Sequence, residues 1–362
     1  MFWSKDKETP LKFTFENVRI DSFAVNLPTK GMTTDELEDK LTPLYKKLKI
    51  PVGTFEKLTG IKNRCYWAPE VSPSQVSTVA ALKALEQSSL KPEQIQALFS
   101  CSITRDYFEP ATSCLVHHEL GLPESSMALD ISNACLGFMN GIVMMSGLIE
   151  SGVIGAGILV SGETILKPIQ YCIDYILNKE DITRDELLKL LPTLTLGSGS
   201  VAYILAHKDL TSSTHKILGG VARSATNHHG LCNGNGDYCH FHDGAFDPIM
   251  TTESGKLISE ASKLGGRAWK QLSAHLNWSR EDVDHIFCHQ VGKQVNEGFY
   301  REMGLDLKKE FTIYEQYGNL ASAALPTALV LGAAEKNIQP GEKIVMTGFG
   351  SGLNALFLGL EW

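Results

Sequence analysis

The stretch ALDISNACLGFMNGIVMMSGL, residues 128–148, places one cysteine, Cys135, at a change of pattern. An apolar run typical of a strand ends just before it, and a longer run that favours a helix begins just after it. At such a turn the free N–H groups and the dipole of the helix stabilise a thiolate and can hold an oxyanion. Cys135 is therefore a candidate nucleophile, and the alternative is a buried structural cysteine without a chemical role.

On either side of this stretch, short β-branched or aromatic runs alternate with longer amphipathic ones. The alternation predicts βαβ units and a largely parallel sheet covered by helices on both faces, so the fold class is α/β. A weak internal repeat adds detail. Residues 95–106, 125–152 and 154–164 resemble residues 283–294, 309–337 and 342–352, and the elements follow in the same order. In this register His289 ends a strand, and Asn319 corresponds closely to Cys135.

Two similar halves are expected to pack closely, because no linker rich in glycine, proline or serine separates them. Residues 1–210 hold Cys135 and an inserted helical segment, and residues 211–362 hold His289 and Asn319. Packing of the halves would bring the strand ends together at one site. The polar stretch NKEDITRDELLKLLPTL, residues 178–194, is interpreted as an inserted helix or lid. The stretch ATNHHGLCNGNGDYCHFHDG, residues 225–244, predicts an irregular loop.

Composition narrows the classes of function. A chain of 362 residues with 43% hydrophobic content can bury a large core. The net charge of -8 comes from interspersed acids and bases, and no cluster of lysine and arginine suggests a nucleic-acid partner. Cysteines without CxxC pairs and an N-terminus without an apolar signal core indicate a reduced, cytoplasmic protein. No apolar run reaches the roughly 18 residues of a membrane span.

Metal and nucleotide sites are not expected. The cysteines and histidines of the loop stretch have no standard zinc spacing; they are His228, His229, Cys232, Cys239, His240 and His242. The glycines of TGFGSGLN, residues 347–354, do not open a βαβ unit in the GxGxxG pattern, and TLGSGS is not a Walker sequence. Dinucleotide and phosphate-loop sites are therefore excluded.

Two further motifs raise the case for Cys135. His289 in CHQVGK lies at a predicted strand end and could donate or accept a proton beside the thiol, although a histidine there can also be a core residue. Asn319 in YGNLASA could join the same site or simply cap the helix that follows.

Together, DISNACLGF, CHQVGK, YGNLASAALP and TGFGSGLN resemble the thiolase superfamily, in the branch of β-ketoacyl-ACP synthase III. The resemblance implies duplicated βαβαβαβ halves in a five-layered αβαβα arrangement, working as a homodimer. It makes Cys135 the acyl-accepting nucleophile, and His289 with Asn319 the pair that binds the thioester oxygen of the second acyl group. The backbone at Gly350 would form the first oxyanion hole with the N–H of Cys135.

Departures from the superfamily pattern narrow the branch. The C-terminal glycine loop lacks the second cysteine of degradative thiolases, and Val291 and Gly292 replace the usual Ala and Asn after the histidine. The stretches SITRDYFEPATSCLVHHELGL and GETILKPIQYCIDYILNKEDITRDELLKLLPTLTLGSGS resemble OleA-type acyl-CoA condensing enzymes. That resemblance makes Glu109 a base that reaches into the partner subunit's site. On its spacing alone, Glu109 could instead be a helix-start or interface carboxylate.

The resemblance implies an acyltransferase that joins two long-chain fatty acyl-CoAs by a non-decarboxylative Claisen condensation, through an acyl-Cys intermediate, to a 2-alkyl-3-oxoacyl product. The alternatives are a decarboxylating synthase III that uses malonyl-ACP, an HMG-CoA-synthase-like enzyme, and a catalytically silent subunit, which the intact cysteine, histidine and asparagine set disfavours. No cofactor is expected beyond coenzyme A thioesters as substrates; acyl carrier protein is a second candidate partner. Phe138, Met139 and Met144 could line acyl channels, or pack in the core.

Overall fold

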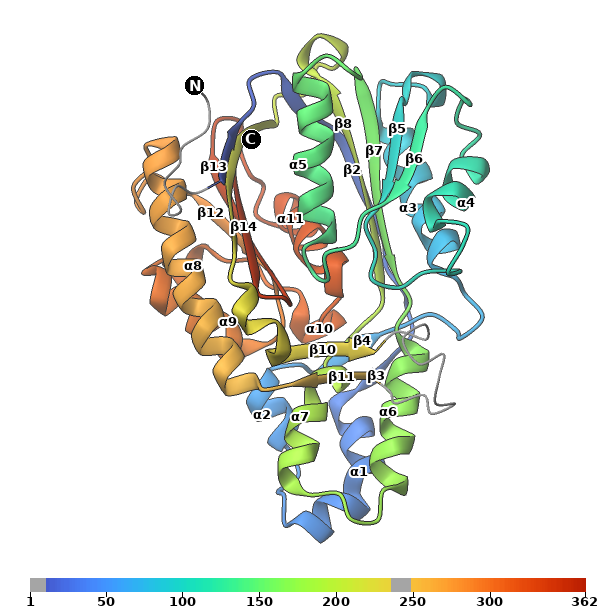
Figure 1. Ribbon diagram of the computed structural model, residues 1–362, viewed down its shortest axis with the longest axis vertical. Helices are drawn as coiled ribbons and strands as arrows, with labels where there is room; N and C mark the ends of the chain where they lie inside the picture. The colour runs from blue at the N-terminus through green and yellow to red at the C-terminus, as the bar shows by residue number, and fades with distance from the viewer. Residues whose placement is uncertain (1–10, 236–248) are drawn as a thin grey trace.

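The computed structural model describes residues 11–235 and 249–362, and its main feature is a ten-stranded mixed sheet (Figure 1). The sheet order is β12-β13-β14-β9-β2-β8-β7-β5-β6, and β1 pairs with β9 beside this path. Its strands are β1 (Leu11–Thr14), β2 (Val18–Asn26), β5 (Ala97–Ser100), β6 (Met127–Asp130), β7 (Ala156–Glu163), β8 (Gly199–His207), β9 (Lys216–Ser224), β12 (His285–Cys288), β13 (Lys343–Gly350) and β14 (Asn354–Glu361).

The strand order confirms the predicted duplication. From the centre outward, β2-β8-β7-β5 in the first half repeats as β9-β14-β13-β12 in the second. The halves meet where β2 and β9 pair through Arg19 and Lys216. Strand β1 belongs to the first half in sequence, yet it pairs with β9 of the second half, Leu11 opposite Ala222. The division of the chain near residue 210 stays a prediction.

The expectation of a largely parallel sheet is wrong. The pairs β5-β6, β5-β7 and β12-β13 are parallel, whereas β7-β8, β2-β8, β13-β14 and β9-β14 are antiparallel. A short turn joins β13 directly to β14, and such a connection requires antiparallel neighbours. The counterpart of β6 in the second half is reduced to one bridge between Ile286 and Glu310.

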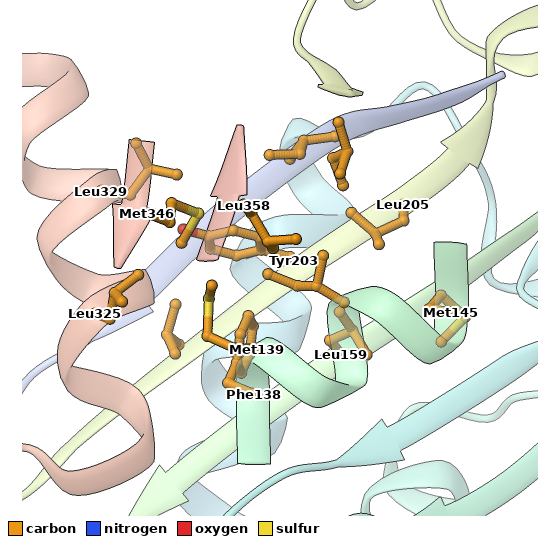
Figure 2. Close-up of a cluster of buried hydrophobic side chains, with 14 of the residues drawn as sticks. Phe138, Met139, Met145, Leu159, Tyr203, Leu205, Leu325, Leu329, Met346 and Leu358 are labelled. Carbon is orange, nitrogen blue, oxygen red and sulfur yellow. The ribbon is translucent and has the colours of Figure 1, made fainter. Parts of the chain in front are cut away.

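Helices complete the five layers of the predicted arrangement. Two inner helices, α5 (Gly137–Glu150) and α11 (Ala324–Glu335), lie between the two halves of the sheet, as Figure 1 shows. The outer faces carry α3 (Pro73–Gln87), α4 (Thr112–Glu119), α8 (Ser254–Leu276) and α9 (Lys293–Met303). Because the inner helices face a sheet on both sides, they are apolar nearly all round. Figure 2 shows Phe138 and Met139 of α5 packed in this core near Tyr203 and Leu325.

A smaller layer lies at one end of the sheet, at the bottom of Figure 1, and has its own core. Its elements are β3 (Gly31–Thr33), α1 (Thr34–Leu48), α2 (Thr54–Thr59), β4 (Asn63–Cys65), α6 (Leu166–Asn178), α7 (Arg184–Leu194), β10 (Cys232–Asn235), β11 (Ile249–Thr252) and α10 (Tyr314–Tyr317). The 3₁₀ helices of the chain are η1 (Pro92–Gln94), η2 (Lys208–Leu210), η3 (Thr226–Leu231), η4 (Leu307–Lys309) and η5 (Ala321–Ala323).

The two inserted stretches differ in outcome. The helix predicted in residues 178–194 is confirmed as α7, which begins at a capping box in which Thr183 and Glu186 bind each other's backbone N–H groups. The loop predicted for residues 225–244 is partly wrong. Residues 232–235 form a strand because β11, further along the chain, pairs with it; residues 236–248 lie outside the described part. None of the helices described here has the length and apolar character needed to cross a bilayer.

Candidate active site

Cys135 lies in the turn between β6 and α5, as the sequence predicts. The turn is closed by hydrogen bonds from Leu136 N to Asn133 O (2.9 Å) and from Gly137 N to Ala134 O (3.1 Å). Ala134 adopts a φ of 48°, a left-handed conformation that a non-glycine residue keeps only when its surroundings hold it. A Cβ on Gly137 would lie 2.4 Å from the carbonyl oxygen of Cys101, the residue directly after β5. Only glycine therefore allows the helix to start this close to β5.

An asparagine bridge connects this turn with the turn between β13 and β14. Asn133 Nδ2 donates to Asn140 Oδ1 at 2.7 Å, and Asn354 Nδ2 donates to Asn133 Oδ1 at 3.2 Å. Asn354 Nδ2 also lies 3.2 Å from Ser351 O, next to Gly350. A Cβ on Gly350 would lie 3.3 Å from Asn133 O, so the two backbones run close together. The bridge holds in register the two segments expected to supply the oxyanion-hole N–H groups.

One cavity brings most of the predicted site residues together. Cys135, His289, Asn319 and Gly350 all line a cavity of about 550 Å³, a volume typical of small-molecule sites. Much of its wall is apolar and comes from α7, α8, α9 and the C-terminal turn: Leu188, Leu191, Leu257, Ile258, Val295, Phe299, Phe349 and Leu353. The internal repeat of the sequence predicts that the three polar residues lie close together. It does not predict which apolar residues form the cavity wall, because that wall depends on contacts between helices distant in the sequence.

The environment of Cys135 differs from the sequence expectation. Burial, together with smaller contributions from the nearby Cys232 and Glu163, raises the pKa of the Cys135 thiol to about 12. This pKa favours the protonated thiol at neutral pH, whereas the sequence predicts a thiolate stabilised by the helix start; that thiolate stays a prediction. A partner must take that proton when the sulfur attacks.

His289 is placed to be that partner. It follows the last residue of β12, its N–H donates to Thr347 O at 2.9 Å, and it is 4% exposed. Burial lowers its pKa to about 4, so the imidazole is neutral at pH 7. Its Nδ1 has no hydrogen-bond partner within the described part of the chain. A neutral imidazole at the cavity wall can accept a proton or donate its own N–H to an oxygen.

Asn319 is fixed on three sides. Its N–H donates to Thr195 O and its carbonyl accepts from Gly197 N, both at 2.9 Å. Gly318 has a φ of 76°, and a Cβ there would lie 2.8 Å from Thr195 O, so this approach needs glycine. Asn319 Oδ1 accepts from Ala321 N at 3.0 Å within its own turn, whereas the N-caps of η5 and α11 are Leu320 and Ala323, so Asn319 is not the helix cap that the sequence left open. Because this bond occupies Oδ1, the Nδ2 group of Asn319 is the part of the side chain that can donate a hydrogen bond into the cavity.

Glu109 lies elsewhere. It is exposed, it precedes Pro110, and it is not among the residues that line the cavity of its own chain. The segment that carries it is held by Asp106, which accepts from Ser74 Oγ (2.6 Å) and Thr112 Oγ1 (3.1 Å). A single chain therefore does not bring Glu109 to Cys135.

The predicted substrate-lining residues are corrected by the structure. Phe138 and Met139 are 0% and 1% exposed and belong to the core of Figure 2, while Met144, also in α5, is 49% exposed. None of the three lines the cavity. An inner helix between two halves of a sheet is as apolar as a ligand channel, so sequence alone could not separate these roles.

The histidines and cysteines that the structure describes do not gather into a metal site. Over residues 11–235 and 249–362, no group of three or more metal-ligating side chains comes together. Cys232 instead lines the cavity and accepts a hydrogen bond from Thr252 Oγ1 at 3.4 Å. Cys239, His240 and His242 lie outside the described residues.

Comparison with known proteins places this geometry in context. Residues 273–362 match the family model for the C terminal of 3-oxoacyl-[acyl-carrier-protein] synthase III. The acyl-CoA:acyl-CoA alkyltransferase of Shewanella oneidensis is 34% identical over 352 residues, which cover 96% of this chain and 99% of the relative. A crystal structure of cerulenin-bound OleA from Xanthomonas campestris has a TM-score of 0.91 at 31% identity and covers 96% of this chain and 98% of that chain. A structure described as 3-oxoacyl-(acyl carrier protein) synthase III from Xanthomonas oryzae has a TM-score of 0.90 at 31% identity, over 97% and 100% of the two chains.

Proposed function

This chain belongs to the OleA-type branch of the thiolase superfamily, the acyl-CoA:acyl-CoA alkyltransferases, and on that premise we propose that it joins two long-chain fatty acyl-CoA molecules by a non-decarboxylative Claisen condensation. The observation that carries the proposal is that Cys135, His289 and Asn319 line one largely apolar cavity. Each methylene of an acyl chain buried there contributes about 0.8 kcal/mol of binding free energy.

In the first step the Cys135 sulfur attacks the thioester carbonyl of one acyl-CoA. Because burial keeps the thiol protonated, neutral His289 accepts its proton as the carbon–sulfur bond forms. The N–H groups of Cys135 and Gly350 hold the oxyanion, and removal of one such donor typically costs about 10² to 10³ in rate. Collapse of the intermediate breaks the bond to coenzyme A, which leaves with a proton, and an acyl-Cys135 thioester remains.

In the second step the other acyl-CoA places its thioester oxygen against His289 and the side-chain amide of Asn319. A base removes a proton from the α-carbon, and the two donors stabilise the enolate oxygen. The enolate carbon attacks the acyl-Cys135 carbonyl, a carbon–carbon bond forms, and the Cys135 sulfur leaves and takes back a proton. The product is a 2-alkyl-3-oxoacyl thioester, or the β-keto acid after hydrolysis.

The base of this step is Glu109, supplied by the neighbouring subunit of a homodimer. Support comes from its place outside the cavity of its own chain, next to Tyr107 and Phe108, which are 56% and 70% exposed. Exposed aromatic side chains suit a surface that a second copy covers, and Thr112 N, further along the same segment, donates to Asp130 at the end of the edge strand β6. A cytoplasmic location and contact with acyl carrier protein stay predictions.

The second candidate is a decarboxylating synthase III, favoured by the family model and by the Xanthomonas oryzae structure. Such an enzyme generates its enolate by loss of CO2 from malonyl-ACP and needs no base. Purified protein incubated with acyl-CoAs of varied length, with and without malonyl-ACP, separates the two. Coenzyme A release and a product mass that contains both acyl chains, without CO2, support the proposal. Release of CO2 as the main reaction contradicts it, and a 3-hydroxy-3-methylacyl product formed from acetyl-CoA and a 3-oxoacyl-CoA would instead favour the HMG-CoA-synthase-like alternative.

A further inference from the structure

A buried carboxylate without a role in the proposed chemistry lies where three parts of the fold meet. Glu163, the last residue of β7, is 0% exposed. Its Oε1 accepts from Ile103 N (2.9 Å) and Ser322 Oγ (2.6 Å). Its Oε2 accepts from Thr104 N (3.0 Å) and Thr104 Oγ1 (2.9 Å). Both oxygens are thus occupied by donors, an arrangement that only a group with two acceptor oxygens can satisfy.

One side of this cluster holds the Asn319 turn. Ser322 lies in η5, directly after Ala321, whose φ of 52° is a left-handed conformation for a non-glycine residue. Such a conformation costs about 1 to 3 kcal/mol and persists only where the surrounding structure determines it. The bond from Ser322 to Glu163 and the 2.7 Å contact between Ser322 Oγ and Ser161 Oγ supply that constraint from outside the turn. Inside the turn, Ala321 N fixes the Asn319 amide.

The other side holds the start of the segment that carries Glu109. Ile103 and Thr104 follow β5, and both donate their backbone N–H groups to Glu163. Thr104 Oγ1 also accepts from Thr164 N at 3.2 Å, which ties the segment to the residue after Glu163. Asp106 anchors the next part of the segment. Glu163 therefore fixes the start of the segment that carries Glu109.

We propose that Glu163 is a positioning residue for the condensation step, because one carboxylate holds both the Asn319 turn and the Ile103–Glu109 segment in place. The proposal rests on the proposed function, in which Asn319 binds the enolate oxygen and Glu109 is the base. Glu163 acts through these two residues and does not touch the substrate. It also lies near enough to Cys135 to contribute to the raised pKa of the thiol, which agrees with its place beside the site.

The test separates acylation from condensation in Glu163→Gln. An amide nitrogen in place of one oxygen would meet a donor, so part of the cluster must open. Condensation is expected to fall about 10²-fold, the effect of a misplacement of about 1 Å, while acylation of Cys135 stays within a few-fold of wild type. Intact-mass measurement follows acylation, and product mass follows condensation. Wild-type condensation in Glu163→Gln, or an equal loss of both steps, overturns the proposal.

Two milder variants keep the test decisive if Glu163→Gln does not fold. Ser322→Ala removes the bond to the Asn319 turn. Thr104→Val removes the contacts of the Thr104 hydroxyl with Glu163, Gly162 and Thr164 while keeping the side-chain shape. Each is expected to lower condensation selectively, and Glu163→Asp is expected to recover part of the activity lost in Glu163→Gln. Each substitution should also have a non-additive effect on condensation when it is combined with Glu163→Gln, because residues in one hydrogen-bond network are energetically coupled. If neither Ser322→Ala nor Thr104→Val lowers condensation selectively, the proposed role of Glu163 is wrong.

The two proposals fail in different ways. If wild-type protein condenses acyl-CoA only with malonyl-ACP, the proposed function is wrong, since no base is then required. Glu163→Gln and Ser322→Ala should still impair that decarboxylating condensation through Asn319, whereas Thr104→Val should not. If wild-type protein joins two acyl-CoAs and Glu163→Gln does so equally well, the proposed function stands and the role of Glu163 is wrong.

Discussion

The side-chain amide of Asn354 donates a hydrogen bond of 3.2 Å to the side-chain oxygen of Asn133, two residues before the cysteine at the cavity wall. Asn133 passes the connection to α5 by donating to Asn140 at 2.7 Å. The nucleophile turn and the C-terminal turn, which come from opposite halves of the chain, are thus held by a shared side-chain network. The oxyanion hole proposed between Cys135 and Gly350 depends on this register.

Replacement of Asn133 by alanine should slow acylation of Cys135 by about 10-fold or more, because the two N–H groups lose their fixed spacing. Rapid-quench intact-mass measurement with one acyl-CoA gives the rate, and a melting curve reports on the fold. Asn354→Ala should act in the same direction. An unchanged acylation rate in both variants would show that the asparagine bridge does not position the oxyanion-hole N–H groups.

Cys135 should be the only cysteine that carries an acyl group after treatment with acyl-CoA. Among the cysteines that the structure describes, it alone combines a helix-start turn with a place in the cavity beside His289 and Asn319, whereas Cys101 and Cys288 are buried and do not line that cavity. Peptide mapping by mass spectrometry locates the adduct, and Cys135→Ala serves as the control. An adduct on Cys101 or Cys288 with Cys135 unmodified is the contrary result.

The raised pKa predicts a slow reaction of Cys135 with iodoacetamide at pH 7. With a pKa of about 12, only about one thiol in 10⁵ is ionised there, and the rate should rise about tenfold with each unit of pH up to that value. Exposed Cys114 is the internal reference and should react first. Faster labelling of Cys135 than of Cys114 at pH 7 would show a stabilised thiolate.

Asn319→Ala should lower condensation by about 10² to 10³ while leaving acylation nearly intact, since its amide is proposed to bind only the enolate oxygen. His289→Ala should impair both steps, because the imidazole also accepts the thiol proton in the first one. Half-reaction assays compare the two variants directly. Equal loss of both steps in Asn319→Ala would indicate a general structural role for the turn.

Glu109→Ala should abolish condensation of two simple acyl-CoAs and leave Cys135 acylation intact, because general base catalysis typically contributes about 10² to 10⁴ in rate. Mixing Glu109→Ala subunits with Cys135→Ala subunits should restore about a quarter of the activity, since half of the dimers then hold one complete site. Full activity of Glu109→Ala, or no recovery on mixing, contradicts a base supplied by the partner.

The sequence predicts the meeting of Cys135, His289 and Asn319 because Cys135 and His289 each follow a strand and Asn319 corresponds to Cys135 in the internal repeat. The same pattern underlies the duplicated halves. It does not reveal the cavity wall, since Leu188 of α7 and Phe299 of α9 belong to ordinary amphipathic helices until the fold brings them together. Glu163 carries no motif either; its role follows only from four donors contributed by two separate segments.

Strand β1 gives the duplication a further meaning. If each half of a duplicated fold contained all of its own strands, either half could be lost or exchanged as a separate module. In this chain Leu11–Thr14, at the start of the first half, pair with a strand of the second half instead. Separation of the two halves would leave β9 without its partners β1 and β2, and would leave β1 unpaired.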